Sequence, residues 1–85
     1  MNRKQQKTLR AIFVVPTLAS VNFSDIEKLL VALGAEVTES SGSRLAFALN
    51  NQQIFVHHPH PAKEAKKYQV EAFREFLELA GVKNE

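Results

Sequence analysis

Two segments in which large apolar residues recur at every second position flank the dipeptide Asn50-Asn51, and this pattern constrains the fold more than any other feature. A period of two is typical of β-strands. The residues that share one predicted face are Leu45, Phe47, Leu49, Ile54 and Val56. Asparagine tolerates left-handed backbone angles, so we expect a two-residue hairpin turn that pairs residues whose numbers sum to 101. A four-residue turn would keep the faces but shift the partners.

The hairpin puts a second set of side chains on the opposite face of the two strands. With the two-residue turn, Arg44 lies opposite His57 and Ala46 lies opposite Phe55. A proton-transfer group, a cation and an aromatic ring therefore converge on one side of the predicted sheet. An ordinary arginine beside an ordinary histidine on a solvated sheet would give the same sequence pattern.

Three helices are expected from apolar residues at helical spacing. The first runs from about Gln5 to Phe13. The second begins at Ser24, because Ser24 and Glu27 have the spacing of a capping box, and it is about ten residues long. The third runs from about Gln69 to Ala80. The residues expected to face the core are Leu9, Ile12, Phe13, Ile26, Leu29, Leu30, Leu33, Val70, Phe73, Phe76, Leu77 and Ala80.

A further strand is expected before the hairpin. Ala35 and Val37 alternate with polar residues, which is typical of a half-buried edge strand. Ser40-Ser41-Gly42-Ser43 then breaks the chain, and His58-Pro59-His60-Pro61 ends the last strand because proline cannot donate to a strand ladder. The predicted fold is α+β, a three-stranded antiparallel sheet with helices packed on one face and the other face open to solvent.

Length and composition narrow the function classes. A chain of 85 residues makes a single domain, residues 1–85, whose core is too thin for a deep pocket, so no large cofactor is expected. The absence of cysteine excludes disulfides, thiolate nucleophiles and cysteine-ligated metal centres. No stretch resembles a signal peptide or a membrane span. We therefore expect a cytoplasmic protein that needs neither a membrane nor a small-molecule cofactor.

Charge is distributed unevenly along the chain. Arg3, Lys4, Lys7 and Arg10 put four positive charges and no acid into the first ten residues, whereas the remaining 75 carry seven basic and nine acidic residues. A protein held on nucleic acid mainly by phosphate contacts is more basic than this main body. Any contact between RNA and the main body must therefore be local.

The predicted pairing of Arg44 with His57 suits RNA chemistry. A histidine side chain titrates at about pH 6.5, so it can accept or donate a proton near neutral pH. A guanidinium holds a phosphate through two hydrogen bonds, and an exposed ring such as Phe55 stacks an unpaired base. Without a metal ion, such a site would promote attack of a 2′-hydroxyl on the adjacent phosphorus.

Two further groups of residues lie near the end of the predicted hairpin. Lys63, Lys66 and Lys67 form a candidate phosphate-contacting edge, although Glu64 among them equally fits a solvated loop. The histidines at positions 57, 58 and 60 are numerous enough for an open zinc site, as in a small metal-binding protein. The prolines between them constrain this segment, and no helical His-x-x-x-His motif accompanies it. Packed or solvated rings are the alternative, and no metal is assigned.

Five segments together resemble the HicA toxins, over about residues 24–82. They are, in order, Asp25-Ile26-Glu27-Lys28-Leu29-Leu30, Leu33-Gly34-Ala35, Ser41-Gly42-Ser43, His60-Pro61-Ala62-Lys63-Glu64 and Phe76-Leu77-Glu78-Leu79-Ala80-Gly81-Val82. The resemblance implies a fold like that of double-stranded-RNA-binding domains, metal-independent ribonuclease activity on messenger RNA, and neutralisation by a partner antitoxin, HicB. Residues 24–82 would form the HicA-like core, and residues 1–23 a basic N-terminal extension with a short extra helix.

One position departs from this family. HicA toxins usually carry their catalytic histidine directly after the glycine-serine turn, and the matching residue here is Arg44, which stays protonated and cannot act as a general base. Either His57 has taken over proton transfer, or the chain binds RNA or a protein without cutting. In the second case Ala46, Ala48 and Phe55 would form an apolar docking face. The candidate catalytic residues are His57, Arg44 and His60, and the candidate RNA-binding residues are Arg44, Phe55, Lys63, Lys66 and Lys67.

Overall fold

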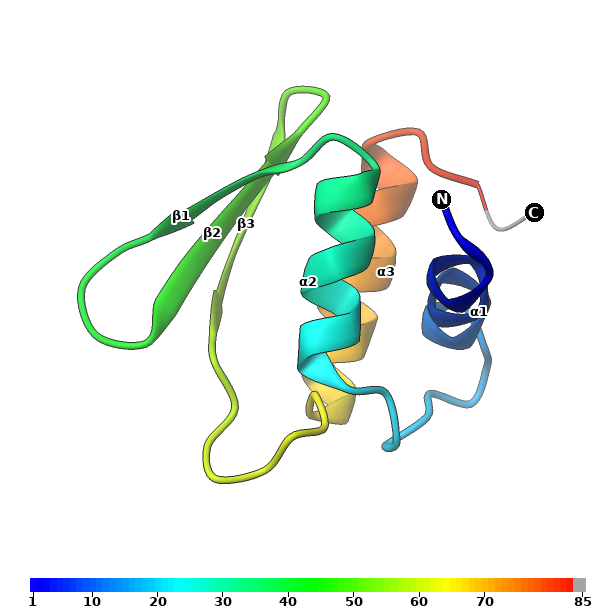
Figure 1. Cartoon of the computed structure of the whole chain (residues 1–85), viewed down its shortest axis with the longest axis horizontal. Coiled ribbons are helices and arrows are strands. Elements are labelled where there is room, and N and C mark those ends of the chain that lie inside the picture. The colour runs from blue at the N-terminus through cyan, green and yellow to red at the C-terminus, as the bar shows by residue number, and fades with distance from the viewer. Residues whose placement is uncertain (84–85) are drawn as a thin grey trace.

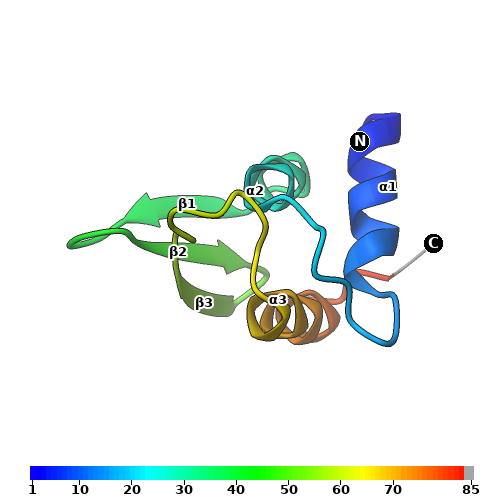
Figure 2. The ribbon, with the colours of Figure 1, turned by 90° about the horizontal axis from the view of Figure 1, so that it is seen from below.

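The computed structural model of the chain describes residues 1–83, which form three layers (Figures 1 and 2). The elements are α1 (Arg3–Ile12), α2 (Phe23–Ala32), β1 (Glu36–Glu39), β2 (Arg44–Leu49), β3 (Gln52–His57) and α3 (Lys67–Leu79). The antiparallel sheet, in the order β1-β2-β3, is the first layer. Helices α2 and α3 cover one face of the sheet, and α1 lies on their far side (Figure 2). The predicted α+β fold with one open sheet face is confirmed.

The β2–β3 hairpin has the register expected from Asn50-Asn51. The antiparallel partners run from Arg44 with His57 to Leu49 with Gln52, so the numbers in every pair sum to 101. Asn50 and Asn51 have φ angles of 49° and 66°, in the left-handed region that a tight two-residue turn requires. The Asn50 side chain also donates a hydrogen bond of 2.7 Å to the Ala80 carbonyl, just after α3. The turn therefore fixes the pairing of β2 with β3, and it also fixes the position of this hairpin against the end of α3.

The core lies between the sheet and the pair α2 and α3. Three phenylalanines, Phe23 of α2, Phe47 of β2 and Phe73 of α3, join these elements and are at most 1% exposed. The ring centroid of Phe73 lies 5.9 Å from that of Phe23 and 5.5 Å from that of Phe47, both edge-on. Of the residues expected to face inward, those that are buried are Leu9, Ile12, Ile26, Leu29, Leu30, Val70, Phe73, Phe76, Leu77 and Ala80. The remaining two, Phe13 and Leu33, are partly buried against this core.

The predicted start of α2 at Ser24 is wrong. The helix begins at Phe23, and the side chain of its N-cap, Asn22, makes no capping hydrogen bond. The Phe23 N–H instead donates to the Lys63 carbonyl at 3.0 Å, and Asn22 forms an isolated antiparallel bridge with Glu64. The loop after β3 thus satisfies one of the first-turn donors that have no partner within the helix. Ser24 lies inside the helix for this reason.

β1 is the exposed edge of the sheet, which corrects the expectation of a half-buried strand. It covers Glu36–Glu39 rather than beginning at Ala35, and all four residues are exposed. Val37 pairs with Phe47 and so lies on the helix-facing side, yet it is 38% exposed. The end of the sheet at the β1–β2 turn extends past the helices (Figure 1). Alternation predicts which side a residue faces but not whether another element covers that side.

α1 is a packed helix that begins earlier than expected. Asn2 and Gln5 form a capping box, in which each side-chain oxygen accepts from the other residue's backbone N–H, at 2.8 and 2.9 Å. The helix therefore starts at Arg3 and buries Leu9 and Ile12 on the side of α2 and α3. No helix among residues 1–83 is long and apolar enough to cross a membrane.

Arg74 of α3 fastens the end of α1. Its Nε donates to the Ile12 carbonyl at 2.8 Å, and its Nη2 donates to the Val14 carbonyl and to the Thr17 hydroxyl, both at 3.0 Å. A cation at the C-terminal end of a helix also complements the helix dipole. The third layer is thus attached to α3 by polar contacts in addition to apolar packing.

Candidate nucleic-acid interface

Arg44, Phe55 and His57 come together on the open face of the sheet. Arg44 begins β2, His57 ends β3, and the two are direct antiparallel partners. This geometry places Cβ atoms about 4.5–5.5 Å apart. Phe55 lies two residues before His57 on the same face, and the Arg44 Cζ atom lies 4.4 Å from its ring centroid. All three side chains are exposed. The structure therefore brings together, on an accessible face, the three residues that the hairpin pattern predicts to lie side by side.

The Arg44 guanidinium covers one face of the Phe55 ring as a cation–π pair. That ring face is therefore not free for the base stacking expected from the sequence. A base can stack instead on the opposite ring face or on the outer plane of the guanidinium. The His57 ring forms no hydrogen bond or ion pair with residues 1–83, so both of its nitrogens are open to a substrate.

The rest of the open face is shallow and carries little charge. Ala46 is buried and Ala48 is half-buried, so these small side chains form a floor. Glu36 of β1 lies at the far end of the face, opposite Ala48. Arg44 is the only lysine or arginine that the three strands place on this face. A phosphate that reaches the open face therefore meets its strongest attraction at Arg44.

A buried side chain on α3 holds the end of β3 in place. Gln69 is 2% exposed; its Nε2 donates to the His57 carbonyl at 2.8 Å, and its Oε1 accepts from the Lys66 N–H at 3.0 Å. Because α3 begins at Lys67 rather than at Gln69, this glutamine lies in the first turn and caps it. Helical periodicity does not single out Gln69. Its position three residues after the N-cap is the feature that identifies it once the helix start is known.

We expect Gln69→Leu to lower the free energy of unfolding by about 1–3 kcal/mol, because the His57 carbonyl and the Lys66 N–H lose their partner. Gln53→Leu, on the exposed face of β3, is the matched control and should change it by less than about 0.5 kcal/mol. Urea denaturation followed by circular dichroism measures both. Equal unfolding midpoints for the two variants would show that the Gln69 hydrogen bonds do not stabilise the fold.

His58 belongs to a different environment from His57. Its ring packs on Phe23 with centroids 4.9 Å apart, and its Nε2 lies 3.6 Å from Glu27 Oε1. Its Nδ1 lies 3.2 Å from the Pro59 carbonyl. These contacts tie the end of β3 to α2. No group of three histidine or acidic side chains within residues 1–83 is arranged to hold a metal ion, so the structure does not support the zinc hypothesis.

The remaining predicted residues lie between β3 and α3. His60 is exposed, and within residues 1–83 no hydrogen bond or ion pair joins it to His57. Lys63 is exposed on the loop whose backbone bonds to the start of α2. Lys66 is the N-cap of α3 and Lys67 its first residue, so neither lies in the middle of a loop. The two lysines start the helix that is bonded to the end of β3.

Comparison with known families identifies the main body of the chain. The family described as "HicA toxin of bacterial toxin-antitoxin" matches residues 23–82, which include α2, the sheet and α3. The chain belongs to the HicA toxin family. All of the open-face residues lie inside the matched region of this HicA chain, and α1 lies outside it. No curated protein and no solved structure matches the chain.

Membership in the HicA family makes the chain the toxin component of a toxin–antitoxin pair, which implies an antitoxin partner. The order α2-β1-β2-β3-α3, with both helices on one sheet face, is the fold that the resemblance to HicA toxins implies, like that of double-stranded-RNA-binding domains. α1 is an additional layer on this HicA core.

Proposed function

We propose that this HicA toxin binds RNA on the open face of its sheet and cleaves messenger RNA without a metal ion. The observation that carries the proposal is the direct pairing of Arg44 with His57 beside Phe55. Arg44 supplies a fixed positive charge, and His57 supplies an exposed imidazole on the neighbouring strand. Neighbouring strands lie about 4.8 Å apart, so one phosphodiester group with its ribose can reach both side chains.

The proposed chemistry is a proton-coupled transfer at phosphorus. His57 accepts the proton of the ribose 2′-hydroxyl, and the 2′-oxygen attacks the adjacent phosphorus. The bond between phosphorus and the 5′-oxygen of the next nucleotide breaks, and the imidazolium returns the proton to that oxygen. The products are a 2′,3′-cyclic phosphate and a 5′-hydroxyl. Arg44 stabilises the charge that develops on the phosphoryl oxygens.

The surroundings of this pair support an extended RNA contact. Lys66 and Lys67 lie at the start of α3, next to the end of β3, and offer further charges for the RNA backbone. Lys63 and His60 lie on the preceding exposed loop. The antitoxin partner in this proposal is HicB-like, and it neutralises the toxin by covering Arg44 and His57.

The proposal is tested with purified toxin, freed from its antitoxin, and a long single-stranded RNA in the presence of EDTA. We expect cleavage that leaves 2′,3′-cyclic phosphate ends. Arg44→Ala should weaken RNA binding about 10-fold or more, because it removes charge-assisted hydrogen bonds to phosphate. Arg44→Lys keeps the charge but not the planar fork and should be intermediate. Binding is measured with 2′-O-methyl RNA, which lacks the nucleophile. If the affinity of Arg44→Ala for 2′-O-methyl RNA is unchanged, the open face does not bind RNA.

A second function, binding without cleavage, is favoured by the identity of residue 44. Arg44 stands where HicA toxins usually carry a histidine, and its guanidinium cannot accept a proton. In this case the folded protein would bind 2′-O-methyl RNA but leave unmodified RNA intact. The same assay therefore separates the two functions.

A further inference from the structure

The exposed side of α1 carries a line of basic side chains. Arg3, Lys7 and Arg10 recur at i, i+4 and i+7, within about 60° of one another around the helix axis and opposite the buried Leu9 and Ile12. We term these three residues the basic stripe. All three are exposed, and no ion pair joins them to an acidic side chain among residues 1–83. α1 itself contains no acidic residue.

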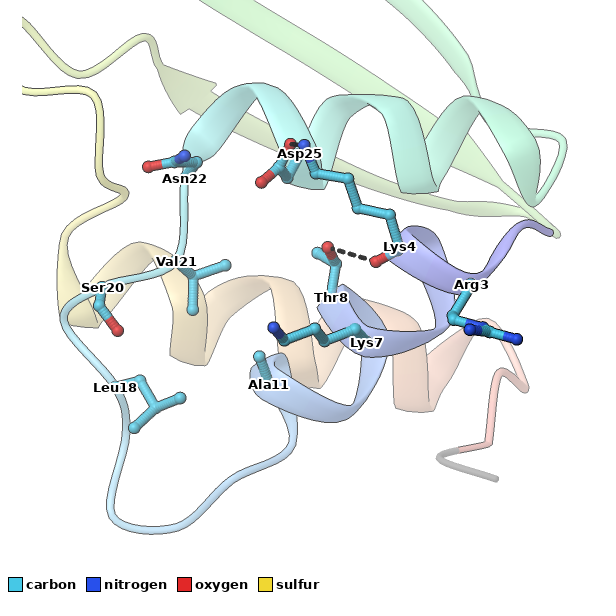
Figure 3. A pocket seen from close by; sticks show the side chains of 10 residues that line it. All are labelled: Arg3, Lys4, Lys7, Thr8, Ala11, Leu18, Ser20, Val21, Asn22 and Asp25. Carbon is cyan, nitrogen blue, oxygen red and sulfur yellow. Dashed lines mark hydrogen bonds and ion pairs between the residues drawn. The ribbon is translucent and has the colours of Figure 1, made fainter.

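A cleft of about 750 Å³ lies beside the stripe, between α1, the α1–α2 connection and the start of α2 (Figure 3). Lys7 extends over this cleft, and Lys4 reaches across to Asp25, with 3.5 Å between Nζ and Oδ1. Arg3 also lines the cleft. The apolar residues of the lining are Ala11, Leu18 and Val21, and the neutral polar ones are Thr8, Ser20 and Asn22.

Two of the positive charges of α1 are placed against its helix dipole, whereas Arg10 lies in the last turn, where a cation is favourable. Arg3 and Lys4 occupy the first turn, which contains no acidic residue, although the N-terminal end of a helix favours negative charge. This arrangement lowers the stability of the helix. A departure from local preference of this kind is expected at functional sites, and an anion bound there would relieve the repulsion.

We propose that the basic stripe and the adjacent cleft bind the phosphodiester backbone of a nucleic acid, at a site separate from the open sheet face. Three cations at intervals of about 6 and 4.5 Å along one line suit a polyanion better than a single small anion. In this arrangement Lys7 holds a phosphate, and the apolar part of the cleft takes the sugar and base attached to it.

Two other anionic surfaces fit the stripe less well. An acidic protein would be expected to meet exposed apolar or aromatic anchors, and the stripe presents none. A lipid surface would take up the apolar side of an amphipathic helix, but Leu9 and Ile12 are already buried on the side of α2 and α3. Binding of a nucleic-acid backbone, by contrast, requires only a regular series of cations such as the basic stripe.

The proposed site goes beyond the function of the open face, because α2 and α3 separate α1 from the sheet (Figure 2). One nucleotide cannot contact the stripe and Arg44 at once. The stripe therefore raises affinity for a long strand, or for a second nucleic acid, and takes no part in the chemistry at His57.

The test compares variants of the full chain. Lys7→Gln is matched by Lys28→Gln, which removes the same charge from an exposed site on α2 outside the cleft. A triple variant combines Arg3→Gln, Lys7→Gln and Arg10→Gln, and glutamine has a helix propensity close to that of lysine and arginine. Fluorescence anisotropy measures affinity for a labelled strand of about 20 nucleotides, between about 50 and 200 mM salt. The strand is either 2′-O-methyl RNA or DNA of the same sequence.

We expect the triple variant to bind the labelled strand at least about 10-fold more weakly than the wild type does. The plot of log affinity against log salt concentration should also be less steep by about 2, because each single-strand phosphate contact contributes about 0.7 to the slope. Lys7→Gln should change the slope by about 0.7 and Lys28→Gln should not change it. Equal losses of affinity for the RNA and the DNA strand identify the phosphodiester backbone as the ligand. A loss confined to the RNA strand shows that the ribose is contacted as well. Both outcomes support the proposal. Unchanged affinity and slope in the triple variant, or an equal loss in Lys28→Gln, would overturn it.

The same triple substitution in an Arg44→Ala background separates this site from the open face. Independent contacts should give additive losses, and the loss at the stripe should persist even if the open face binds no RNA. Binding of the antitoxin and of vesicles containing phosphatidylserine is measured alongside. If the triple variant binds the antitoxin or the vesicles more weakly while its affinity for nucleic acid is unchanged, the stripe is a protein or lipid site and the proposal is wrong.

Discussion

RNA cleavage by the His57→Ala variant is expected to fall at least about 100-fold, the lower end of what a positioned general base contributes. His57 is the exposed imidazole directly opposite Arg44, and arginine cannot take the proton in its place. Affinity for 2′-O-methyl RNA should change much less than the cleavage rate, because Arg44 and Phe55 remain. Initial rates at saturating RNA, with the anisotropy measurement beside them, separate these two effects.

The same substitution at His60 tests the other candidate histidine. If His60→Ala loses cleavage while His57→Ala keeps it, the proton-transfer role belongs to the loop after β3. Full cleavage in both variants would contradict a role for either histidine. Both side chains are exposed, so urea denaturation should show both variants as stable as the wild type, to within about 0.5 kcal/mol.

Phe73→Ala is expected to lower the free energy of unfolding by about 3–5 kcal/mol, more than Gln69→Leu does. The ring is 0% exposed and packs edge-on against both Phe23 and Phe47, so its removal opens a cavity where α2, β2 and α3 meet. Folded domains are stable by only about 5–15 kcal/mol, so this loss removes about a fifth or more of the free energy of unfolding. Urea denaturation followed by circular dichroism measures the change.

Leu79→Ala is the control for Phe73→Ala, because Leu79 also lies on α3 but is 61% exposed. It should change the free energy of unfolding by less than about 1 kcal/mol. Phe73→Leu keeps part of the buried volume and should fall between the two. If Phe73→Ala unfolds at the same urea concentration as Leu79→Ala, the three phenylalanines are not the centre of the core.

The hairpin that carries the candidate site could be predicted because local chemistry determines it. Asn50 and Asn51 accept the left-handed angles of a two-residue turn, and the period of the flanking residues fixes the faces. Together these place Arg44 opposite His57 without any knowledge of the rest of the chain. The inward residues of α3 follow from helical periodicity in the same way.

Features that depend on contacts between distant segments could not be predicted. α2 begins at Phe23 because the Lys63 carbonyl accepts its N–H. The fastening of His57 by Gln69 depends on where α3 begins. No local pattern contains either contact. Likewise, the position of Arg44 over Phe55 depends on the conformations of two side chains on different strands, whereas the register predicts only that they are close.

Phe55 orders Arg44 before any ligand arrives. A free arginine side chain gives up as much as about 2 kcal/mol of conformational entropy when it is immobilised, and this loss weakens the binding of whatever immobilises it. Because the guanidinium already rests 4.4 Å from the ring centroid, part of the loss occurs during folding rather than during binding. Phe55 therefore strengthens the affinity of Arg44 for an anion even where the ring itself touches no ligand.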